Sequence, residues 1–544
     1  MRVSSVALAT WLVATLAAGL LVPAWRESQT PDEAVYVTSG LSYWRTGDFR
    51  LNVEHPPLVK LWLAIPLLFR GATWQPADAD WRGASQWDVA PKVLYRNVSP
   101  GHELLVNGRM MNVLLTFGLI ALAAAWAWKT WGRRAALLAA VLLAVEPNVL
   151  ASGHLATTDI GFTLAVLASI FMFGLYLERR TATRLFTAAT TFGLALLTRF
   201  NALLLVPVLI VLFFVSRRGK TGKLRLGEIS RVVIVFAAVS FFLIWAAYGF
   251  EVRSLNAVQD RAANDLLNQW GSFGQLVQRI ELPAASYVSG LLWQVAHNSG
   301  GQPAYLFGQT SQYGWWYYFP VALAIKMTLA SLGLALVSLM TLRSPGHQPS
   351  SAIFTPRFLG VSLFLLTIFM MVSKLDLGVR YALPTIVLLI IFGSGVARTG
   401  WKTRKVLSVA VSLLVAFHVV SVSRFFPHWL PYANEAFGGP SKLERYLIDS
   451  NLDWGQDLPL VRQYLEHQGI VDYRFMSFTT APAAAYGLRE SPVPTDEEVS
   501  QKPFHGVVII GKSVLHYPGR QFRWLQDIKP TVVLGNSVNV YDLR

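Results

Sequence analysis

The sequence of 544 residues contains no cysteine. Disulfide bonds, thiolate catalysis and cysteine-ligated zinc are therefore excluded. Charged residues are also scarce, at 14% of the chain, whereas a typical soluble protein has about a quarter. Because 53% of the residues are hydrophobic, we expect a lipid bilayer to be the main solvent of the chain.

Positive charge is in excess, with a formal net charge of +16 at pH 7. In a soluble protein such an excess would favour nucleic-acid binding. Here the Lys and Arg residues fall in short clusters between apolar runs, an arrangement that is typical of membrane topology. We therefore expect membrane lipids as partners and no nucleic acid.

Eleven apolar runs are candidates for transmembrane helices. A spanning helix needs about 20 mostly apolar residues, and fewer where packing in a bundle shields its ends. The runs cover residues 6–23, 110–128, 135–151, 161–177, 185–198, 200–215, 231–249, 317–341, 358–373, 380–397 and 406–423. The fold class expected is a polytopic α-helical membrane protein with about 11 transmembrane helices.

The connecting segments predict an orientation, because cytoplasmic loops collect Lys and Arg. Five alternate loops are basic and almost free of acidic residues: 129–134, 178–184, 217–225, 342–357 and 398–405. We therefore expect a multi-pass protein of the inner (plasma) membrane, with a cytoplasmic N-terminus and a periplasmic or extracellular C-terminus. Alternatively, the first run is a cleaved signal peptide that begins with the basic Arg2.

The chain is divided into a membrane domain, residues 1–423, and a small extracytoplasmic α/β domain, residues 424–544. The membrane domain has two large external loops, 24–109 and 250–316. In the first loop, the semi-apolar piece PPLVKLWLAIPLLFRG is too short and too charged to span, and it predicts a helix lying in the membrane interface.

Three local patterns in the tail support the α/β assignment. The segment LPLVRQYLEHQG has helical spacing and should end at Gly469. The apolar run GVVIIG predicts a buried strand, and TVVLGNSVNVYDL alternates around a Gly-Asn pair that is typical of a hairpin.

Asp32 and Glu33 follow the first apolar run closely, so both are expected at the external membrane surface. A carboxylate beside low-dielectric surroundings is a stronger base than one in water, unless a cation holds it. Such a group is well placed to take a proton from an attacking hydroxyl. The alternative is structural, with Asp32 capping an interfacial helix.

Asp159 stands at the external end of the fourth run, with His154 five residues before it. An ionisable residue at the end of a span is a candidate functional residue, and this one faces the same compartment as Asp32. It could instead cap the following helix. A zinc pair with His154 would lack a defined third ligand.

Three cations are expected on the external side, where the charge rule disfavours them: Arg199, Lys374 and Arg380. Something should compensate each of them, and a lipid phosphate would do so, because Arg binds phosphate oxygens in pairs and Lys supplies a point charge. The alternatives are snorkelling to lipid headgroups or pairing with Asp376.

The segment HNSGGQPAYLFGQTSQYGWWYYFP supplies His297, Asn298 and Trp315 as candidates for an acceptor or sugar groove, because sugar rings stack on aromatic faces. An interfacial aromatic belt is the alternative. In the tail, DSNLDWGQD places Asp449, Asn451 and Asp453 at the alternating ligand positions of a calcium loop. Trp454 stands where such a loop needs glycine, which favours a polar loop over calcium. No metal or other cofactor is firmly predicted, although a divalent metal would be compatible with these acids.

Six motifs in order resemble the bacterial glycosyltransferase family 39, membrane proteins of the GT-C class that are similar to protein O-mannosyltransferases and lipid A aminoarabinose transferases. The motifs are PDEAVYVTSGLSYWRTGDFRLNVEHPPLVK, SGHLATTDIGFTL, LLTRFNALLLVP, HNSGGQPAYLFGQTSQYGWWYYFP, LDLGVRYALP and DSNLDWGQDL. They extend from about residue 30 to residue 465.

The resemblance implies a sugar donor attached to polyprenyl phosphate and an active site on the external face. It implies that the Asp-Glu motif, Asp32 and Glu33, supplies the base, and that cations such as Arg199 and Arg380 hold the lipid phosphate. Relatives often carry a basic residue three or four positions after the Asp, where this chain has Val35 and Tyr36. That cation is expected from elsewhere, with His55 and Lys60 as the candidates.

The function expected is a membrane glycosyltransferase of the cell envelope, a hexosyl- or pentosyltransferase with Asp32 as general base. Its partners would be a polyprenyl-phosphate-linked sugar and an acceptor protein, lipid or glycan. The main alternative is a transporter or a flippase for lipid-linked sugars, which would need polar groups near the middle of the bilayer. A non-catalytic membrane scaffold is a third reading.

Overall fold

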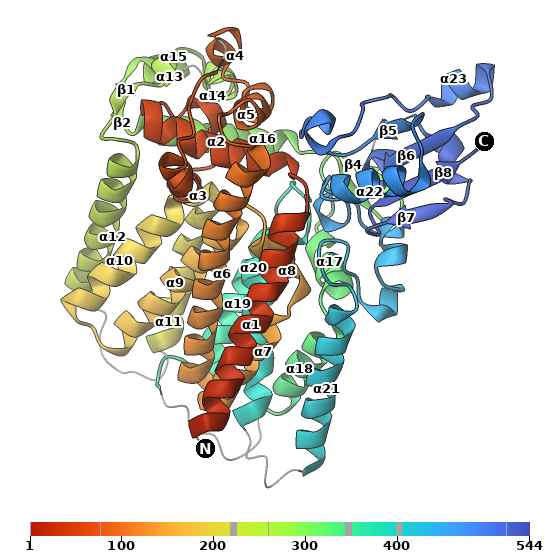
Figure 1. Cartoon of the computed structure of the whole chain (residues 1–544). Helices are drawn as coiled ribbons and strands as arrows, with labels where there is room; N and C mark the ends of the chain where they lie inside the picture. Colours follow the sequence, from red (N-terminus) through yellow and green to blue (C-terminus); the bar gives the residue numbers. More distant parts are fainter. Residues whose placement is uncertain are drawn as a thin grey trace.

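The computed structural model describes residues 2–544 except 77, 218–225, 259, 343–350, 399–404, 518 and 520. A bundle of long helices carries an upper layer of short helices, and a small β-sheet lies beside that layer (Figure 1). The N-terminus lies at the lower end of the bundle and the C-terminus at the upper end, next to the sheet.

Within the described ranges, six helices are long and apolar enough to cross a membrane, and two bent pairs raise the number to eight. The six are α6 (Gly101–Trp131), α9 (Asp159–Glu178), η2 (Phe200–Leu204) with α11 (Leu205–Arg217), α12 (Leu226–Ala247), η3 (Val379–Ala382) with α20 (Leu383–Gly393) and η4 (Ser394–Arg398), and α21 (Lys405–Ser423). The polytopic membrane fold is confirmed. Three of the eleven predicted spans correspond to α1 (Arg2–Arg26), α10 (Ala182–Leu196) and α19 (Pro356–Met371), which are not among these eight. That these three helices also cross the membrane stays a prediction.

The two bent pairs each break at a side-chain cap. Between α7 (Arg133–Ala144) and α8 (Pro147–Gly153), the Glu146 carboxylate accepts a hydrogen bond from the Val149 amide at 2.8 Å. Between α17 (Tyr318–Lys326) and α18 (Leu329–Met340), Thr328 caps the second helix in the same way. A cap satisfies amides that begin a new helix, so the chain turns there, by 62° and 110° respectively.

The upper layer is built around α2 (Pro31–Thr46) and α3 (Leu58–Phe69). Thr30 and Glu33 form a capping box at the start of α2, and Gly47 ends the helix in a left-handed conformation. A Cβ atom on Gly40 would lie 2.0 Å from the carbonyl oxygen of Lys60, so only glycine lets the two helices come this close. The expected helix near residue 58 is confirmed, while its place in a membrane interface stays a prediction.

The tail forms a four-stranded mixed sheet in the order β5-β6-β8-β7. The elements are α22 (Leu458–Gln468), β5 (Arg474–Met476), β6 (Val507–Gly511), β7 (Val532–Leu534) and β8 (Val538–Asp542). β5 and β6 are parallel, and the other neighbours are antiparallel. The predicted helix end at Gly469 is confirmed, as are the buried strand and the hairpin, whose Gly535 and Asn536 both have positive φ.

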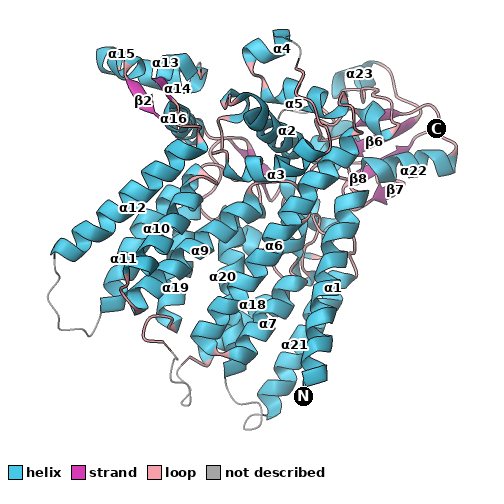
Figure 2. Cartoon of the chain, turned by 60° about the vertical axis from the view of Figure 1, so that its left-hand side comes forward, coloured by secondary structure: helices cyan, strands magenta, loops and turns pink. Residues whose placement is uncertain are grey.

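The tail is joined closely to the segment that follows α1. The Ser28 hydroxyl donates to the Gly455 carbonyl oxygen at 2.7 Å, and the Gln29 amide donates to the Tyr486 hydroxyl at 3.0 Å. Figure 2 shows the strands of the tail near the upper end of α1, from which this segment leaves. The boundary expected at residue 424 is therefore crossed by buried hydrogen bonds.

Candidate active site

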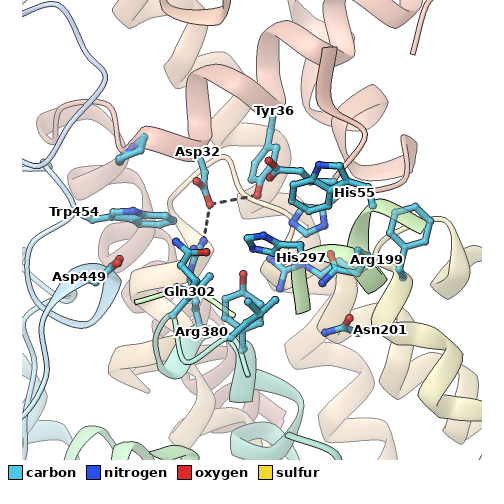
Figure 3. Close-up of a pocket in the computed structure, with 18 of the residues that line it drawn as sticks. Asp32, Tyr36, His55, Arg199, Asn201, His297, Gln302, Arg380, Asp449 and Trp454 are labelled. Carbon is cyan, nitrogen blue, oxygen red and sulfur yellow. Dashed lines mark hydrogen bonds and ion pairs between the residues drawn. The ribbon is translucent and has the colours of Figure 1, made fainter. Parts of the chain in front are cut away.

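A cavity of about 370 Å³ lies where the upper layer, the bundle and the tail meet (Figure 3). Its walls come from α2, the segment after α10, α16 (Ala285–Gly300), η3 and the loop before α22. The polar and aromatic lining includes Asp32, Tyr36, Glu54, His55, Trp87, Arg199, Asn201, Trp293, His297, Gln302, Arg380, Asp449 and Trp454.

Three charged residues expected from the sequence, Asp32, Arg199 and Arg380, line this cavity, and a fourth, Asp159, contacts both arginines from behind. Nη1 of Arg380 lies 2.7 Å from Oδ2 of Asp32 and 3.8 Å from Oδ2 of Asp159. Nη2 of Arg199 lies 2.7 Å from Oδ1 of Asp159. The expected proximity of these residues is thereby confirmed, although 348 positions separate Asp32 from Arg380.

Asp32 faces the cavity from the first turn of α2 (Figure 3). Besides its ion pair with Arg380, it accepts a hydrogen bond from the Tyr36 hydroxyl at 3.3 Å. Tyr36 occupies one of the positions where relatives often carry a cation. In this chain a neutral donor stands there, and Arg380, 348 positions along the chain from Asp32, supplies the positive charge.

Asp159 lies behind the two arginines rather than in the cavity wall, with 1% of its surface exposed. Nε of Arg199 also donates to the Thr158 hydroxyl at 2.8 Å, so both residues at the start of α9 hold the same guanidinium. Asp159 is thus placed to hold Arg199, and a catalytic role for it stays a prediction. His154 bonds to Glu27 at 2.8 Å, which leaves the proposed zinc pair without support.

Glu33 is completely buried outside the cavity, and its predicted catalytic role is corrected. Both of its carboxylate oxygens accept from the Arg109 guanidinium at 2.7 Å, and one also accepts from the Ala156 amide at 2.7 Å. Burial alone would raise the pKa of Glu33, but the Arg109 charge and the hydrogen bonds lower it below its usual value. Glu33 thus joins α2 to α6.

Lys60 is also corrected, because it is fully buried beneath the cavity. Its Nζ donates to the carbonyl oxygens of Asn52 and His55, both at 2.6 Å, and to the Tyr43 hydroxyl at 2.9 Å. All its hydrogen bonds are satisfied within the fold, and burial lowers its pKa well below the ordinary value. Lys60 therefore organises the loop that presents His55.

His55 does line the cavity. Its pKa lies well below the ordinary value, first because of burial and then because Arg199, Lys60 and Arg380 are positively charged. A neutral ring would offer a ligand a hydrogen bond instead of a charge.

The segment after α12 is only partly in the cavity wall. His297 lines the cavity and stacks on Trp293, with ring centroids 4.7 Å apart. Asn298 lines a neighbouring apolar groove instead. The Trp315 amide donates to Asp376 at 2.7 Å, and its side chain packs against the core of the bundle, which corrects its assignment to a sugar groove.

Lys374 is exposed outside the cavity, with its Nζ 5.2 Å from the centre of the Tyr313 ring. Only its backbone amide contacts Asn298, at 3.3 Å from the side-chain oxygen. The prediction that Lys374 binds the donor phosphate in this cavity is therefore corrected.

The tail supplies three cavity residues that are absent from the predicted site: Asp449, Trp454 and Phe478. The Trp454 ring lies over the Arg380 guanidinium, with 4.1 Å between its centre and Cζ. Asp449 lines the same cavity (Figure 3), and burial raises its pKa to about 6. The motif DSNLDWGQD contains both Asp449 and Trp454, but its spacing indicates only a polar loop and does not reveal that the loop lines a cavity. Asn451 and Asp453 bind backbone amides of Val379 and Ser513, so the three calcium-like positions diverge.

Glu54 is a third carboxylate in the cavity wall. It directly precedes His55, so its position in the sequence could have indicated a place in the site. Its Oε1 accepts a hydrogen bond from the Gln86 amide at 2.5 Å. Burial raises the pKa of Glu54 to about 7. The cavity therefore contains a carboxyl group that changes its charge near neutral pH.

A larger apolar groove of about 530 Å³ adjoins the polar cavity. The two share five lining residues: Phe200, Asn201, Gln294, Leu375 and Tyr381. The rest of the groove is formed mainly by apolar side chains of α9, η2, α16 and α19. A ligand with a polar head and a long apolar tail would fit both parts at once.

Among the described residues, no group of three or more His, Asp or Glu side chains is arranged to hold a metal ion. The acids of the cavity are paired with arginines or with amide groups instead. The chemistry that the geometry offers is that of anion binding and proton transfer.

Known proteins resemble the chain in sequence and in fold. A family model described as dolichyl-phosphate-mannose-protein mannosyltransferase matches residues 102–245, which include Arg109, Asp159 and Arg199. No individual curated protein matches the chain in sequence.

Two solved structures of ArnT from Cupriavidus metallidurans match almost the whole chain. The form bound to undecaprenyl phosphate has a TM-score of 0.51 and 12% identity, over 98% of this chain and 97% of that chain. The apo form has a TM-score of 0.52 and 11% identity, over 99% and 98%. At such low sequence identity, the structural similarity establishes the fold alone. The chain therefore has the fold of the GT-C membrane glycosyltransferases, the class that its motifs resemble.

Proposed function

We propose that this protein transfers a sugar from a polyprenyl-phosphate donor to an acceptor hydroxyl at the external face of the membrane. The observation that carries the proposal is the continuity between the cation-containing cavity and the apolar groove. A polyprenyl phosphate has a tail for the groove and an anionic head for the cavity. The ArnT structure bound to undecaprenyl phosphate shows that this fold accommodates such a lipid in that protein.

In this proposal the two arginines bind the phosphate. Arg199 is fixed by Asp159 and Thr158, so its guanidinium is oriented before the ligand arrives. Arg380 is shared between Asp32 and the Trp454 ring. Charge-assisted hydrogen bonds from such preorganised donors stabilise the negative charge that develops on a departing phosphate.

Asp32 is the proposed general base. A bond forms between the acceptor oxygen and the anomeric carbon, the bond from that carbon to the phosphate oxygen breaks, and the acceptor proton passes to the Asp32 carboxylate. The donor phosphate competes for Arg380, which in the described structure occupies Oδ2 of Asp32. Donor binding would thus make the carboxylate available when it is needed.

The direct test is sugar transfer by the protein in lipid vesicles, with undecaprenyl phosphates carrying different radiolabelled sugars. Asp32→Asn should abolish transfer while donor binding stays nearly unchanged. Asp48→Asn is the matched control, because Asp48 pairs with Arg50 in the same external segment and lies outside the cavity. Full transfer by Asp32→Asn would refute the base assignment, and lipid movement without transfer would favour the flippase alternative.

The phosphate site has its own test, the binding of undecaprenyl phosphate. Arg199→Ala should weaken binding by about 1.5–3 kcal/mol, the usual contribution of a hydrogen bond to a charged group. Lys374→Ala should leave binding unchanged, because Lys374 is exposed outside the cavity. Equal losses in the two variants would show that general surface charge, and not this cavity, attracts the lipid.

A further inference from the structure

The loop before α22 reaches from the tail into the cavity and is held there by hydrogen bonds to the bundle. The side-chain oxygen of Asn451 accepts from the Val379 amide at 2.9 Å, next to Arg380. Nζ of the buried Lys326 donates to the Asn451 carbonyl oxygen at 2.7 Å. Residues of the tail are thus positioned as firmly as the helices that carry the arginines.

Asp449 has a left-handed backbone conformation that is held by the rest of the tail. Its φ is +59°, in the left-handed region that side chains other than Asn and Asp rarely adopt. The Asp449 amide donates to the Ser513 hydroxyl at 2.8 Å, so the short helix α24 (Lys512–His516), which follows β6, holds this backbone.

The Asp449 carboxylate has room for a ligand. One oxygen accepts from the Ser450 amide at 2.5 Å, and in the described part of the chain no Lys or Arg forms an ion pair with the carboxylate. It lines the same cavity as Asp32 and both arginines, yet the arginines are held by Asp32 and Asp159. Figure 3 shows it beside Trp454, across the cavity from His55 and Arg199.

We propose that Asp449 is a donor-sugar ligand, which accepts hydrogen bonds from hydroxyl or amino groups of the sugar on the polyprenyl phosphate. The proposal rests on the proposed function and names a determinant of its specificity. A carboxylate accepts hydrogen bonds from neighbouring hydroxyls through both oxygens, and such bonds are stronger than neutral ones. The tail would therefore recognise the sugar, while the bundle binds the phosphate and the lipid.

The test compares the binding of undecaprenyl phosphate with that of undecaprenyl phosphates carrying mannose, glucose or a 4-aminopentose, in detergent, for the full-length protein. The wild-type protein should bind at least one sugar-bearing lipid more tightly than undecaprenyl phosphate. Asp449→Asn should reduce that preference about tenfold and leave the affinity for undecaprenyl phosphate within about twofold. Asn also tolerates the left-handed backbone, so the loop should keep its conformation.

Asp472→Asn is the control variant, since Asp472 lies in the tail with 97% of its side chain exposed. It should keep both affinities. An unchanged sugar preference in Asp449→Asn, no preference in the wild-type protein, or an equal loss of both lipids in Asp449→Asn would each overturn the proposal. Failure of the wild-type protein to bind undecaprenyl phosphate at all would refute the proposed function itself.

Discussion

At the scale of single residues, the neighbours Asp32 and Glu33 have opposite environments. Asp32 faces the cavity, with 15% of its side chain exposed, whereas Glu33 is fully buried against Arg109. The first turn of α2 thus exposes the Asp32 carboxylate to the cavity and buries the Glu33 carboxylate inside the protein. The same motif supplies a candidate base and a structural ion pair.

Glu33→Gln should therefore destabilise the protein more than Asp32→Asn, because Arg380 keeps Asp159 as a second partner when Asp32 is replaced. Removing one partner of a buried ion pair leaves the other charge unpaired, which costs about 3–5 kcal/mol. The pKa of Glu33 is lowered in the fold, so the stabilisation is present above the unfolded pKa near 4.5 and is lost as the pH falls through the folded pKa. Thermal unfolding of both variants in detergent at pH 7 measures this difference, and equal melting temperatures would contradict it.

Glu54 predicts a pH dependence of the opposite sign. Burial raises its pKa from 4.5 to about 7, so the folded state holds a proton that the unfolded chain releases between these pH values. Stability should therefore decrease as the pH rises through this window. Glu54→Gln should raise the melting temperature at pH 8 and change it little at pH 5, because glutamine resembles the protonated acid. A gain of the same size at both pH values would rule out this titration.

At the scale of elements, the cavity depends on how closely α2 packs on α3. A Cβ atom on Gly40 would lie 2.0 Å from the Lys60 carbonyl oxygen and 2.8 Å from the Ala64 Cβ. Neither atom is at the end of a flexible side chain, so the helices themselves would have to separate. Asp32 is carried by the first of these helices and the His55 loop leads into the second, so the cavity would change with them.

Gly40→Ala should therefore lower stability by at least about 1–3 kcal/mol and reduce sugar transfer. Gly360→Ala is the matched control, since Gly360 lies in α19 and its Cβ would meet open space. Alanine there should be neutral or stabilising, because it favours the helix by up to about 1 kcal/mol. Melting temperature and transfer are measured for both variants, and a stable, active Gly40→Ala protein would contradict the packing argument.

At the scale of the whole molecule, the cavity and the sheet lie at one end of the bundle, and the N-terminus lies at the other (Figure 1). If the basic loops are cytoplasmic, the cavity is on the external side. A reporter fused after Arg544 should then be active as an external alkaline phosphatase. One fused after Arg134 should be fluorescent as a cytoplasmic green fluorescent protein. The reverse pattern would move the proposed reaction to the cytoplasmic face.

Sequence alone determined most of the helices and the turns of the tail. Long apolar runs can be stable in a bilayer only when their backbone groups are bonded within the helix, so composition is sufficient to locate them. Gly469 and the pair Gly535-Asn536 mark turns because few other residues adopt positive φ. The bent pairs were predicted as single runs, since apolar composition does not register a capping side chain such as Glu146 or Thr328.

Only the tertiary structure decided which titratable residues face the cavity. Glu33 is buried by Arg109, 76 positions away, and Arg380 reaches Asp32 across 348 positions. Lys60 donates its hydrogen bonds to carbonyl oxygens of the neighbouring loop, so it does not reach the cavity. Trp454 lies over Arg380 although it belongs to the tail. Periodicity and composition are local properties. The partner of a charged side chain depends on which segments the whole fold brings within a few ångströms of it.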